Sequence, residues 1–306
     1  MKVLIATQKP FAAAAVEGIE SILREAGHSV EKLEKYPGEA ELIAAVADAD
    51  ALIVRSDKVT ADVIAAAPSL KIVVRAGAGY DNVDLAAASA RGIVVMNTPG
   101  QNANAVAELA IGLMIYMART QFTPATGSEL AGKTLGVQAF GNVGRLVGQK
   151  AAALGMKVQA LDPFLTDTQI EQAGATPVHS LEELYSTSDY LSVHIPALPE
   201  TIGSIGYDLV RSMPKGAVLV NTARKEVVDE DGLAKALEER PDLKYVTDVM
   251  PDNYAALTEK LGTRVFATPK KMGAQTAEAN INAGLAAARQ IADFFATGNR
   301  RFQVNK

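Results

Sequence analysis

Two successive series of strand-like and helix-like segments constrain the fold of this chain most. The first series has short apolar runs at 3–6, 51–56, 71–76 and 93–97, with helical patterns such as 11–26 and 60–67 between them. The second series has runs at 134–140, 157–162, 189–196, 216–222, 244–249 and 264–269. Strands that are apolar almost throughout are typical of parallel sheets buried on both faces. Because helices alternate with them, we expect an α/β protein with two doubly wound parallel-sheet units.

The 306 residues suffice for both units, at roughly 100–200 residues per domain. A helical pattern over 103–119 joins the two series. An alanine-rich helix over 275–296 follows the last run, and we expect it to pack back on the first unit. Further helices are predicted at 143–154, 180–187, 206–212 and 230–240.

The composition excludes several classes of function. A net charge of −5 and a pI near 5.4 leave no general basic field for nucleic acid or an anionic membrane. There is no cysteine, so disulfides, thiolate metal sites and cysteine nucleophiles are excluded. With three histidines in the chain, we expect no metal centre. The longest helical apolar run, 109–118, spans about half a bilayer, and the N-terminus lacks an export signal, so we expect a cytoplasmic protein.

The sequence AFGNVG lies between a predicted strand and the next helix, and it resembles the GxGxxG turn of dinucleotide-binding proteins. Gly141 lets the backbone approach a pyrophosphate, and Gly144 permits close packing of the helix on the strand. Asn142 and Val143 open the helix, whose N-terminal N–H groups can bind the phosphates. Ala139 replaces the first glycine, which suits the turn if its φ is negative.

An acidic residue completes this pattern. Asp162 ends the following strand, 18 residues after Gly144. An acid at that place accepts hydrogen bonds from the adenosine ribose hydroxyls and repels a 2′-phosphate. Glycines at such a turn are often merely structural, but here strand, glycine turn, helix, strand and acid occur in order. The pattern therefore predicts a dinucleotide site that prefers NAD to NADP.

Five longer segments resemble the D-2-hydroxyacid dehydrogenase family. They are VRAGAGYDNVD (74–84), NTPGQNANAVAELAIG (97–112), SVHIPALPET (192–201), NTARKEVVDEDGL (221–233) and TDVMPD (247–252). The similarity covers nearly the whole chain. It looks closest to the short phosphoglycerate dehydrogenases of that family.

The resemblance implies two Rossmann-like, doubly wound domains with the active site in the cleft between them. The NAD-binding domain is then 101–278, and the substrate-binding domain combines 1–100 with 279–306. Family members are commonly dimers through the nucleotide domain, so we expect a homodimer. The apolar stretch 109–118 fits that interface, and it fits a buried helix equally well. The regulatory domains of longer relatives are not expected.

The resemblance also assigns roles to single residues. Arg224 matches the family's arginine, and a guanidinium there can grip the substrate α-carboxylate with two hydrogen bonds and polarise the adjacent C–O group. A surface salt bridge is the alternative role for Arg224. The residues expected to line the cofactor are His194, Pro196, Thr222, Ala223 and Asp248.

The glutamate and the histidine of the family are both replaced. Asn253 holds the glutamate position, with Asp252 beside it. In TPKKMGAQT the histidine position falls on Lys270 when counted from TP, and on Lys271 when counted back from GAQT. No histidine takes over the role, and His194 lies in a segment on the cofactor side.

The two replacements are chemically consistent with each other. A lysine has a pKa of roughly 10.4, and a neighbouring glutamate would raise it further, away from the range of a useful base. Neutral Asn253 removes that effect, and like-charge repulsion from the adjacent lysine and Arg224 lowers the pKa. In the reverse reaction a lysine ammonium can protonate the forming alkoxide. We therefore expect Lys270 or Lys271 to be catalytic, and a solvated lysine pair is the alternative.

Cations and amide groups follow the strands of the first unit. Arg55, Ser56 and Lys58 end one strand, and Arg75 ends another. Ligands bind at the carboxyl ends of strands in open α/β sheets, so these cations together favour a phosphorylated substrate, although each alone is better explained as a surface charge. Asn102 either lines the cleft or caps the next helix. By resemblance, the substrate carboxylate binds the backbone N–H groups of Ala76, Gly77, Ala78 and Gly79.

The resemblance implies NAD-dependent oxidation of 3-phospho-D-glycerate to 3-phosphohydroxypyruvate, the entry to serine biosynthesis. Hydride would leave C2 for the nicotinamide while a lysine takes the hydroxyl proton. Two other functions fit the same residues. One is a glyoxylate or hydroxypyruvate reductase, which does not need the cations at 55 and 58. The other is a non-catalytic NAD(H)-sensing protein, which the altered catalytic set permits.

Overall fold

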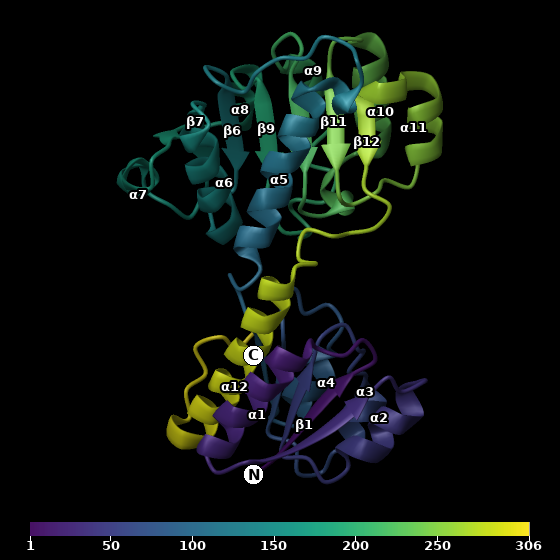
Figure 1. Ribbon diagram of the computed structural model, residues 1–306, viewed down its shortest axis with the longest axis vertical. Helices are drawn as coiled ribbons and strands as arrows, with labels where there is room; N and C mark the ends of the chain where they lie inside the picture. The colour runs from purple at the N-terminus through teal and green to yellow at the C-terminus, as the bar shows by residue number, and fades with distance from the viewer. Residues whose placement is uncertain (306) are drawn as a thin grey trace. The chain divides into compact units, whose positions relative to one another are not determined.

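The computed structural model describes residues 1–305, which pack as two compact units. Unit 1 comprises Met1–Asn102 and the segment from Gln275 onward, and unit 2 comprises Ala103–Ala274. Figure 1 shows the purple and yellow ends of the chain in unit 1 and its teal and green middle in unit 2.

Unit 1 contains a five-stranded parallel sheet with the strand order β2-β1-β3-β4-β5. Its strands are β1 (Lys2–Thr7), β2 (Ser29–Glu34), β3 (Ala51–Val54), β4 (Ile72–Arg75) and β5 (Val94–Asn97). Its helices are α1 (Ala13–Glu25), α2 (Glu39–Val46), α3 (Ala61–Ala65), α4 (Leu85–Ala90) and α12 (Ala277–Thr297).

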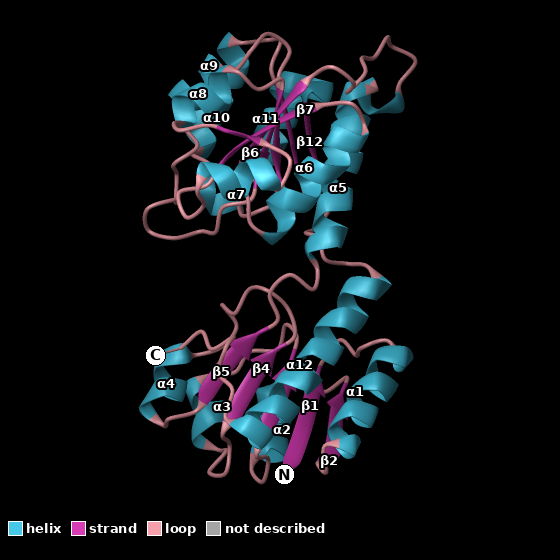
Figure 2. Ribbon diagram, turned by 90° about the vertical axis from the view of Figure 1, so that its left-hand side faces the viewer, coloured by secondary structure: helices cyan, strands magenta, loops and turns pink. Residues whose placement is uncertain are grey.

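Helices cover both faces of this sheet because its central strands are apolar on both faces. Successive side chains of a strand point to opposite faces. In β1, Val3 and Ile5 pack in one core cluster with α1 and α12, whereas Leu4 packs in another with α2, α3 and α4. Figure 2 shows the helices flanking the strands.

Unit 2 contains a seven-stranded parallel sheet with the order β12-β11-β10-β9-β6-β7-β8. Its strands are β6 (Thr134–Gln138), β7 (Lys157–Leu161), β8 (Thr176–Pro177), β9 (Tyr190–Val193), β10 (Val218–Asn221), β11 (Lys244–Thr247) and β12 (Val265–Ala267). Its α-helices are α5 (Ala103–Ala118), α6 (Asn142–Ala153), α7 (Asp167–Gln172), α8 (Leu181–Ser186), α9 (Tyr207–Ser212), α10 (Glu230–Glu239) and α11 (Tyr254–Leu261). Short 3₁₀ turns are η1 (Thr120–Phe122), η2 (Lys225–Val227) and η3 (Gly262–Arg264).

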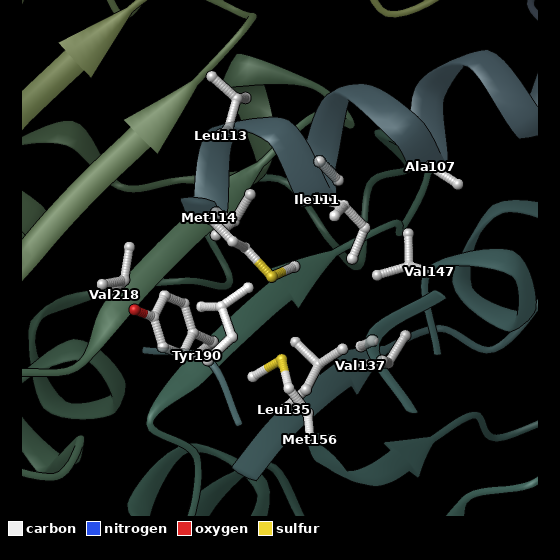
Figure 3. Close-up of a cluster of buried hydrophobic side chains, with 14 of the residues drawn as sticks. Ala107, Ile111, Leu113, Met114, Leu135, Val137, Val147, Met156, Tyr190 and Val218 are labelled. Atoms are coloured by element: carbon white, nitrogen blue, oxygen red, sulfur yellow. The ribbon is translucent and has the colours of Figure 1, made fainter. Parts of the chain in front are cut away.

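The two faces of the second sheet carry separate cores. Figure 3 shows Ile111 and Met114 of α5 packed with Leu135 and Val137 of β6. The opposite face packs against α8, α9, α10 and α11. The strand order reverses at β6, between β9 and β7, and ligands bind at such switch points in open α/β sheets. The structure thus confirms the predicted α/β class with two parallel, doubly wound sheets.

The end of the chain covers the edge strand of unit 1. The backbone N–H of Val304 donates to Val95 O over 2.8 Å, and that of Asn97 to Phe302 O over 3.4 Å. Asn305 is buried, and its side chain accepts from Val95 N (2.8 Å) and donates to Ile93 O (2.8 Å). The unpaired edge of β5 is therefore satisfied by the chain itself.

Asn305→Ala should destabilise unit 1. The change leaves a buried N–H of β5 and a buried carbonyl without their partners, at a cost of roughly 2–3 kcal/mol. Urea unfolding followed by circular dichroism measures this, since the chain has no tryptophan. The matched control is Asn104→Ala, an exposed asparagine whose amide donates to Glu108. Equal stability of the two variants would show that the tail does not protect the edge.

Candidate functional site

The glycine-containing turn lies at the carboxyl end of β6, where the strand ends at Gln138. Ala139 has a φ of +72°, so the condition that its φ be negative is not met, and the predicted strand 134–140 stops before it. The left-handed conformation turns the chain sharply into α6, and Phe140 anchors the turn because it is fully buried. Gly144 is required by close approach: a Cβ there would lie 2.2 Å from the carbonyl oxygen of Ala139.

Asp162 connects this turn to the neighbouring strand. Its carboxylate accepts from the backbone N–H of Phe140 over 2.8 Å and from that of Phe164 over 2.9 Å. Each of its two oxygens accepts one of these bonds, and the residue is partly exposed. Phe164 is 92% exposed beside it, an apolar surface that has no role in the core. Gly141 and Asn142 are exposed, and no atom lies within 4 Å of the Cβ position of Gly141, so the turn leaves room for a phosphate.

His194 follows β9 and is not placed to act as an acid or base at neutral pH. Its backbone N–H donates to Gln138 O over 2.9 Å, and its Nε2 lies 2.9 Å from the Ser192 hydroxyl. Desolvation lowers the pKa of His194 to about 3, so the ring is neutral across the physiological range. Pro196, two residues on, is exposed.

Lys271 and Arg224 meet at one acceptor. The ammonium of Lys271 donates to the carbonyl oxygen of Ala223 over 3.0 Å, and Nη1 of Arg224 donates to the same oxygen over 2.9 Å. Both cations are therefore held at the carboxyl end of β10. Both Lys270 and Lys271 are exposed residues, and the backbone carbonyl of Lys270 accepts from the Thr268 hydroxyl. The geometry thus separates two lysines that counting along the sequence leaves equivalent.

Asp248 lies just beyond the end of β11 and is fully buried. Its Oδ2 accepts from the backbone N–H groups of Met272 (3.2 Å) and Gly273 (2.7 Å), which clamps the loop that carries Lys271. Desolvation raises the pKa of Asp248, while those N–H groups and the cations Lys271 and Arg224 lower it.

Two buried oxygens nearby lack partners among residues 1–305. They are Oδ1 of Asp248 and the hydroxyl of Thr222, directly after the neighbouring strands β11 and β10. Unpaired polar atoms are costly in a protein interior, and such atoms mark places where a polar ligand group completes the structure. Together with the cradle at Gly141 and Gly144, they fit a dinucleotide with a polar group at its far end.

Hydrogen bonds with Glu230 and Lys225 hold the loop after β11. Glu230 accepts from the backbone N–H groups of Asp252 (2.9 Å) and Asn253 (3.1 Å). The carboxylate of Asp252 accepts from the Lys225 ammonium over 2.6 Å, and 81% of its side chain is exposed. Asp252 is therefore committed to a surface ion pair, and Asn253 Oδ1 is buried without a partner among the described residues.

In unit 1, Arg55 acts as a brace between segments. Its guanidinium donates to the carbonyls of Lys9 and Pro10, both over 3.3 Å, and to the Asn280 side chain at the start of α12. Burial lowers the pKa of Arg55, and the charge of Asp57 opposes that shift. Ser56 and Lys58, which were also predicted to bind the substrate, are exposed.

The second strand end of unit 1 holds a bent loop. Nε of Arg75 donates to Arg55 O over 2.8 Å. The loop of Ala76, Gly77, Ala78 and Gly79 is fixed by the side-chain amide of Asn97, which donates to Ala78 O over 2.6 Å, and by Thr98 N, which donates to Gly77 O. Asn102, the last residue of this segment of unit 1, is partly exposed.

Sequence reasoning missed a buried acid in this unit. Asp57 is 5% exposed, and its Oδ1 accepts from Gln8 N and from the Tyr36 hydroxyl, both over 2.6 Å. Its position inside VRSDK, between two cations, was the available signal. Phe164 was missed as well, and the signal was a large aromatic side chain two residues after the acid that ends a strand.

Among residues 1–305 there is no cluster of histidine, aspartate or glutamate suited to a metal ion, and no helix long and apolar enough to cross a membrane.

Comparison with known proteins gives consistent relatives. Residues 105–270 match the family model described as D-isomer specific 2-hydroxyacid dehydrogenase, NAD binding domain. D-3-phosphoglycerate dehydrogenase of Mycobacterium tuberculosis is 39% identical over 272 residues, which are 83% of this chain and 51% of the relative. The chain thus spans about half the length of the curated relatives it matches.

Solved structures match the whole chain. The NAD⁺-bound 3-phosphoglycerate dehydrogenase of Entamoeba histolytica is 49% identical, with a TM-score of 0.90 over 100% of this chain and 99% of that one. A glyoxylate reductase of Paecilomyes thermophila is 27% identical, with a TM-score of 0.81 over 99% of this chain and 98% of that one.

The strain at Ala139 predicts an unusual effect of glycine. A left-handed L-residue costs roughly 1–2 kcal/mol, more than the roughly 0.5–1 kcal/mol of entropy that glycine loses on folding. Ala139→Gly should therefore raise the free energy of unfolding by about 0.5–1 kcal/mol, measured by urea denaturation. Ala125→Gly, in an exposed loop at ordinary φ, is the control and should not stabilise the protein.

Gly144→Ala should lower the free energy of unfolding strongly in the same measurement, because its Cβ would lie 2.2 Å from the backbone carbonyl oxygen of Ala139.

Proposed function

This chain belongs to the D-isomer specific 2-hydroxyacid dehydrogenase family, and we propose that it oxidises 3-phospho-D-glycerate to 3-phosphohydroxypyruvate with NAD. The observation that carries the proposal is the pair of cations on the carbonyl of Ala223, Lys271 and Arg224. A 2-hydroxy acid needs one group that holds its carboxylate and another that takes its hydroxyl proton. The pair supplies both at the carboxyl end of one strand.

We assign the acid–base role to Lys271. In its neutral form the amine removes the proton of the C2 hydroxyl, and in the reverse reaction the ammonium returns it. Arg224 is assigned to the α-carboxylate, where its fork makes two charge-assisted hydrogen bonds and its charge stabilises the developing C2 oxyanion. Lys270 and Asp252 take no part in this assignment.

The chain's own groups fit NAD. Bound NAD supplies the acceptor for the hydride that leaves C2. Gly141, Asn142, Val143 and Gly144 are assigned to the pyrophosphate, and Asp162 to the adenosine ribose. The unpaired Asp248 Oδ1 and Thr222 hydroxyl are assigned, with Ala223, His194 and Pro196, to the nicotinamide end.

The substrate assignments rest on unit 1. Exposed Lys58 and Ser56, with Arg75 behind them, are assigned to the phosphate, while Arg55 mainly holds the surrounding loops together. The backbone of Ala76–Gly79 is assigned to the carboxylate. The proposal assigns substrate binding to 1–100 with 279–306, and NAD binding to 101–278. It also includes a homodimer, a cytoplasmic location and a place in serine biosynthesis.

The substrate is tested by NADH oxidation with phosphohydroxypyruvate, hydroxypyruvate and glyoxylate. The proposal expects phosphohydroxypyruvate to have the highest kcat/KM, by about tenfold or more, since a phosphate gains charge-assisted bonds. Lys58→Gln should raise KM for phosphohydroxypyruvate and leave hydroxypyruvate unaffected. Lys71→Gln, at the opposite end of β4, is the matched control. Equal use of all three substrates would favour a general reductase, and no turnover with any would favour an NAD(H)-sensing protein.

The preference for NADH over NADPH tests the role assigned to Asp162. Asp162→Asn removes the charge that repels a 2′-phosphate. It keeps one acceptor, which can serve the N–H of Phe140 or that of Phe164 but not both, because these two groups bind different oxygens of Asp162. The variant should bind NADPH about tenfold or more tightly than the unchanged protein does, while Asp162→Ala should also weaken NADH binding because the turn loses its tie. Fluorescence titration of both cofactors measures this. Equal affinity of the unchanged protein for NADH and NADPH would remove Asp162 from this role.

The lysine assignment predicts a specific pH dependence. Oxidation needs neutral Lys271, so its rate should rise with pH through an apparent pKa above that of histidine, while reduction falls over the same range. Neutral His194 cannot produce that limb, because its pKa is about 3. Lys271→Ala should lower turnover about 10²–10⁴-fold and flatten the profile, whereas Lys270→Ala should have little effect. Normal turnover in Lys271→Ala would exclude this mechanism.

A further inference from the structure

A small hollow in unit 1 has no part in the proposed reaction. It lies between the second half of α12, the tail after it and the edge strand β5, with a volume of about 210 Å³. That is below the roughly 300–1,000 Å³ of pockets for drug-sized ligands, so it suits a smaller molecule. Met96 and Phe302 provide apolar lining, and the charged groups are Arg289, Asp293 and Arg301.

The charge of this hollow favours an anion. Neither Arg289 nor Arg301 makes a salt bridge within residues 1–305, and the Arg301 guanidinium lies 5.4 Å from the Phe302 ring centroid. The carboxylate of Asp293 is satisfied locally, because it accepts from the Thr297 hydroxyl and the Asn299 amide. Two arginines and one internally bonded carboxylate thus line the hollow, in a chain whose net charge is −5.

Hydrogen bonds connect the hollow to the loop assigned to the substrate carboxylate. Gln290, on its wall, donates from Nε2 to Asn97 O over 3.0 Å, and the carbonyl of Phe302 accepts from Asn97 N over 3.4 Å. The Asn97 amide in turn donates to Ala78 O over 2.6 Å. Asn97 is therefore held on one side by the hollow and holds the loop Ala76–Gly79 on the other.

We propose that this hollow binds a small monocarboxylate with a short apolar body, and that its occupancy changes the position of the loop Ala76–Gly79. The guanidinium groups grip the carboxylate, and Met96 and Phe302 contact the apolar body. Asp293 disfavours a dianion such as a phosphate ester by adding a like charge. The effect on catalysis rests on the proposed function, whereas binding and loop movement do not.

Binding is tested by NMR with butyrate as the probe. In protein labelled at the methionine methyl groups, the Met96 signal, identified by Met96→Leu, should shift saturably with butyrate. Butylammonium, which has the same body and the opposite charge, should have no effect, and inorganic phosphate should shift the signal much less. The shift should disappear in the double variant Arg289→Gln, Arg301→Gln. No shift, an equal shift with phosphate, or a shift that survives the double variant would each overturn the site.

Coupling is tested by two readouts on the same samples. The backbone amide signals of Gly77 and Ala78 should move with the same saturation curve as Met96, which requires no activity. Butyrate should also change KM for phosphohydroxypyruvate at least about twofold. Gln290→Met keeps the hollow but removes the bond to Asn97, so Met96 should still respond while the amide shifts and the KM change are lost. Loop signals that do not respond, or that respond equally in Gln290→Met, would refute the coupling. If the enzyme does not turn over phosphohydroxypyruvate at all, the proposed function fails and the NMR result still decides this inference.

Discussion

The buried carboxylate of Asp248 is the interaction on which the candidate site depends. Two cations, Lys271 and Arg224, donate to one carbonyl, and like charges so close repel each other unless an anion compensates. Asp248 supplies that negative charge and also clamps the loop of Lys271 through the N–H groups of Met272 and Gly273. Burial of an unpaired carboxylate is expensive, so anion and cations stabilise each other. One residue therefore sets both the place and the charge state of this site.

Parallel topology explains why these groups meet although they are distant in the sequence. Ala139, Asp162, His194, Arg224 and Asp248 each follow the carboxyl end of a different strand of one sheet. Neighbouring strands are then joined by side chains, as Asp162 joins β7 to the turn after β6. The left-handed Ala139 lies at the same edge; other non-glycine residues with positive φ are Lys35 and Thr120–Phe122. The apolar cores on both faces make that edge rigid enough to hold such a conformation.

The apolar strands, the glycine turn and the terminal acid could be predicted because each has a strong local signal. β2 (SVEKLE) escaped because it is an edge strand with mostly exposed side chains. The short helices α4 and α7 bury one residue each, too few for a helical period to stand out. The φ of Ala139 could not be read from residue type, because alanine favours negative φ and the surrounding turn overrides that preference. Sequence counting also could not distinguish Lys270 from Lys271, since the contact that distinguishes them is made with Ala223, 48 residues away in the chain.

The altered acid–base set is best understood through the loop after β11. A glutamate at the place of Asn253 would add a carboxylate to the loop after β11, where Asp248 and Asp252 already lie. Here the nearest acid in sequence, Asp252, is held by Lys225 on the surface, and Glu230 is occupied by two backbone N–H groups. Both carboxylates therefore have partners of their own beside this loop. Two charges thus act on Lys271 in opposite directions: the carboxylate of Asp248 stabilises the charged form of the amine, and the guanidinium of Arg224 disfavours it.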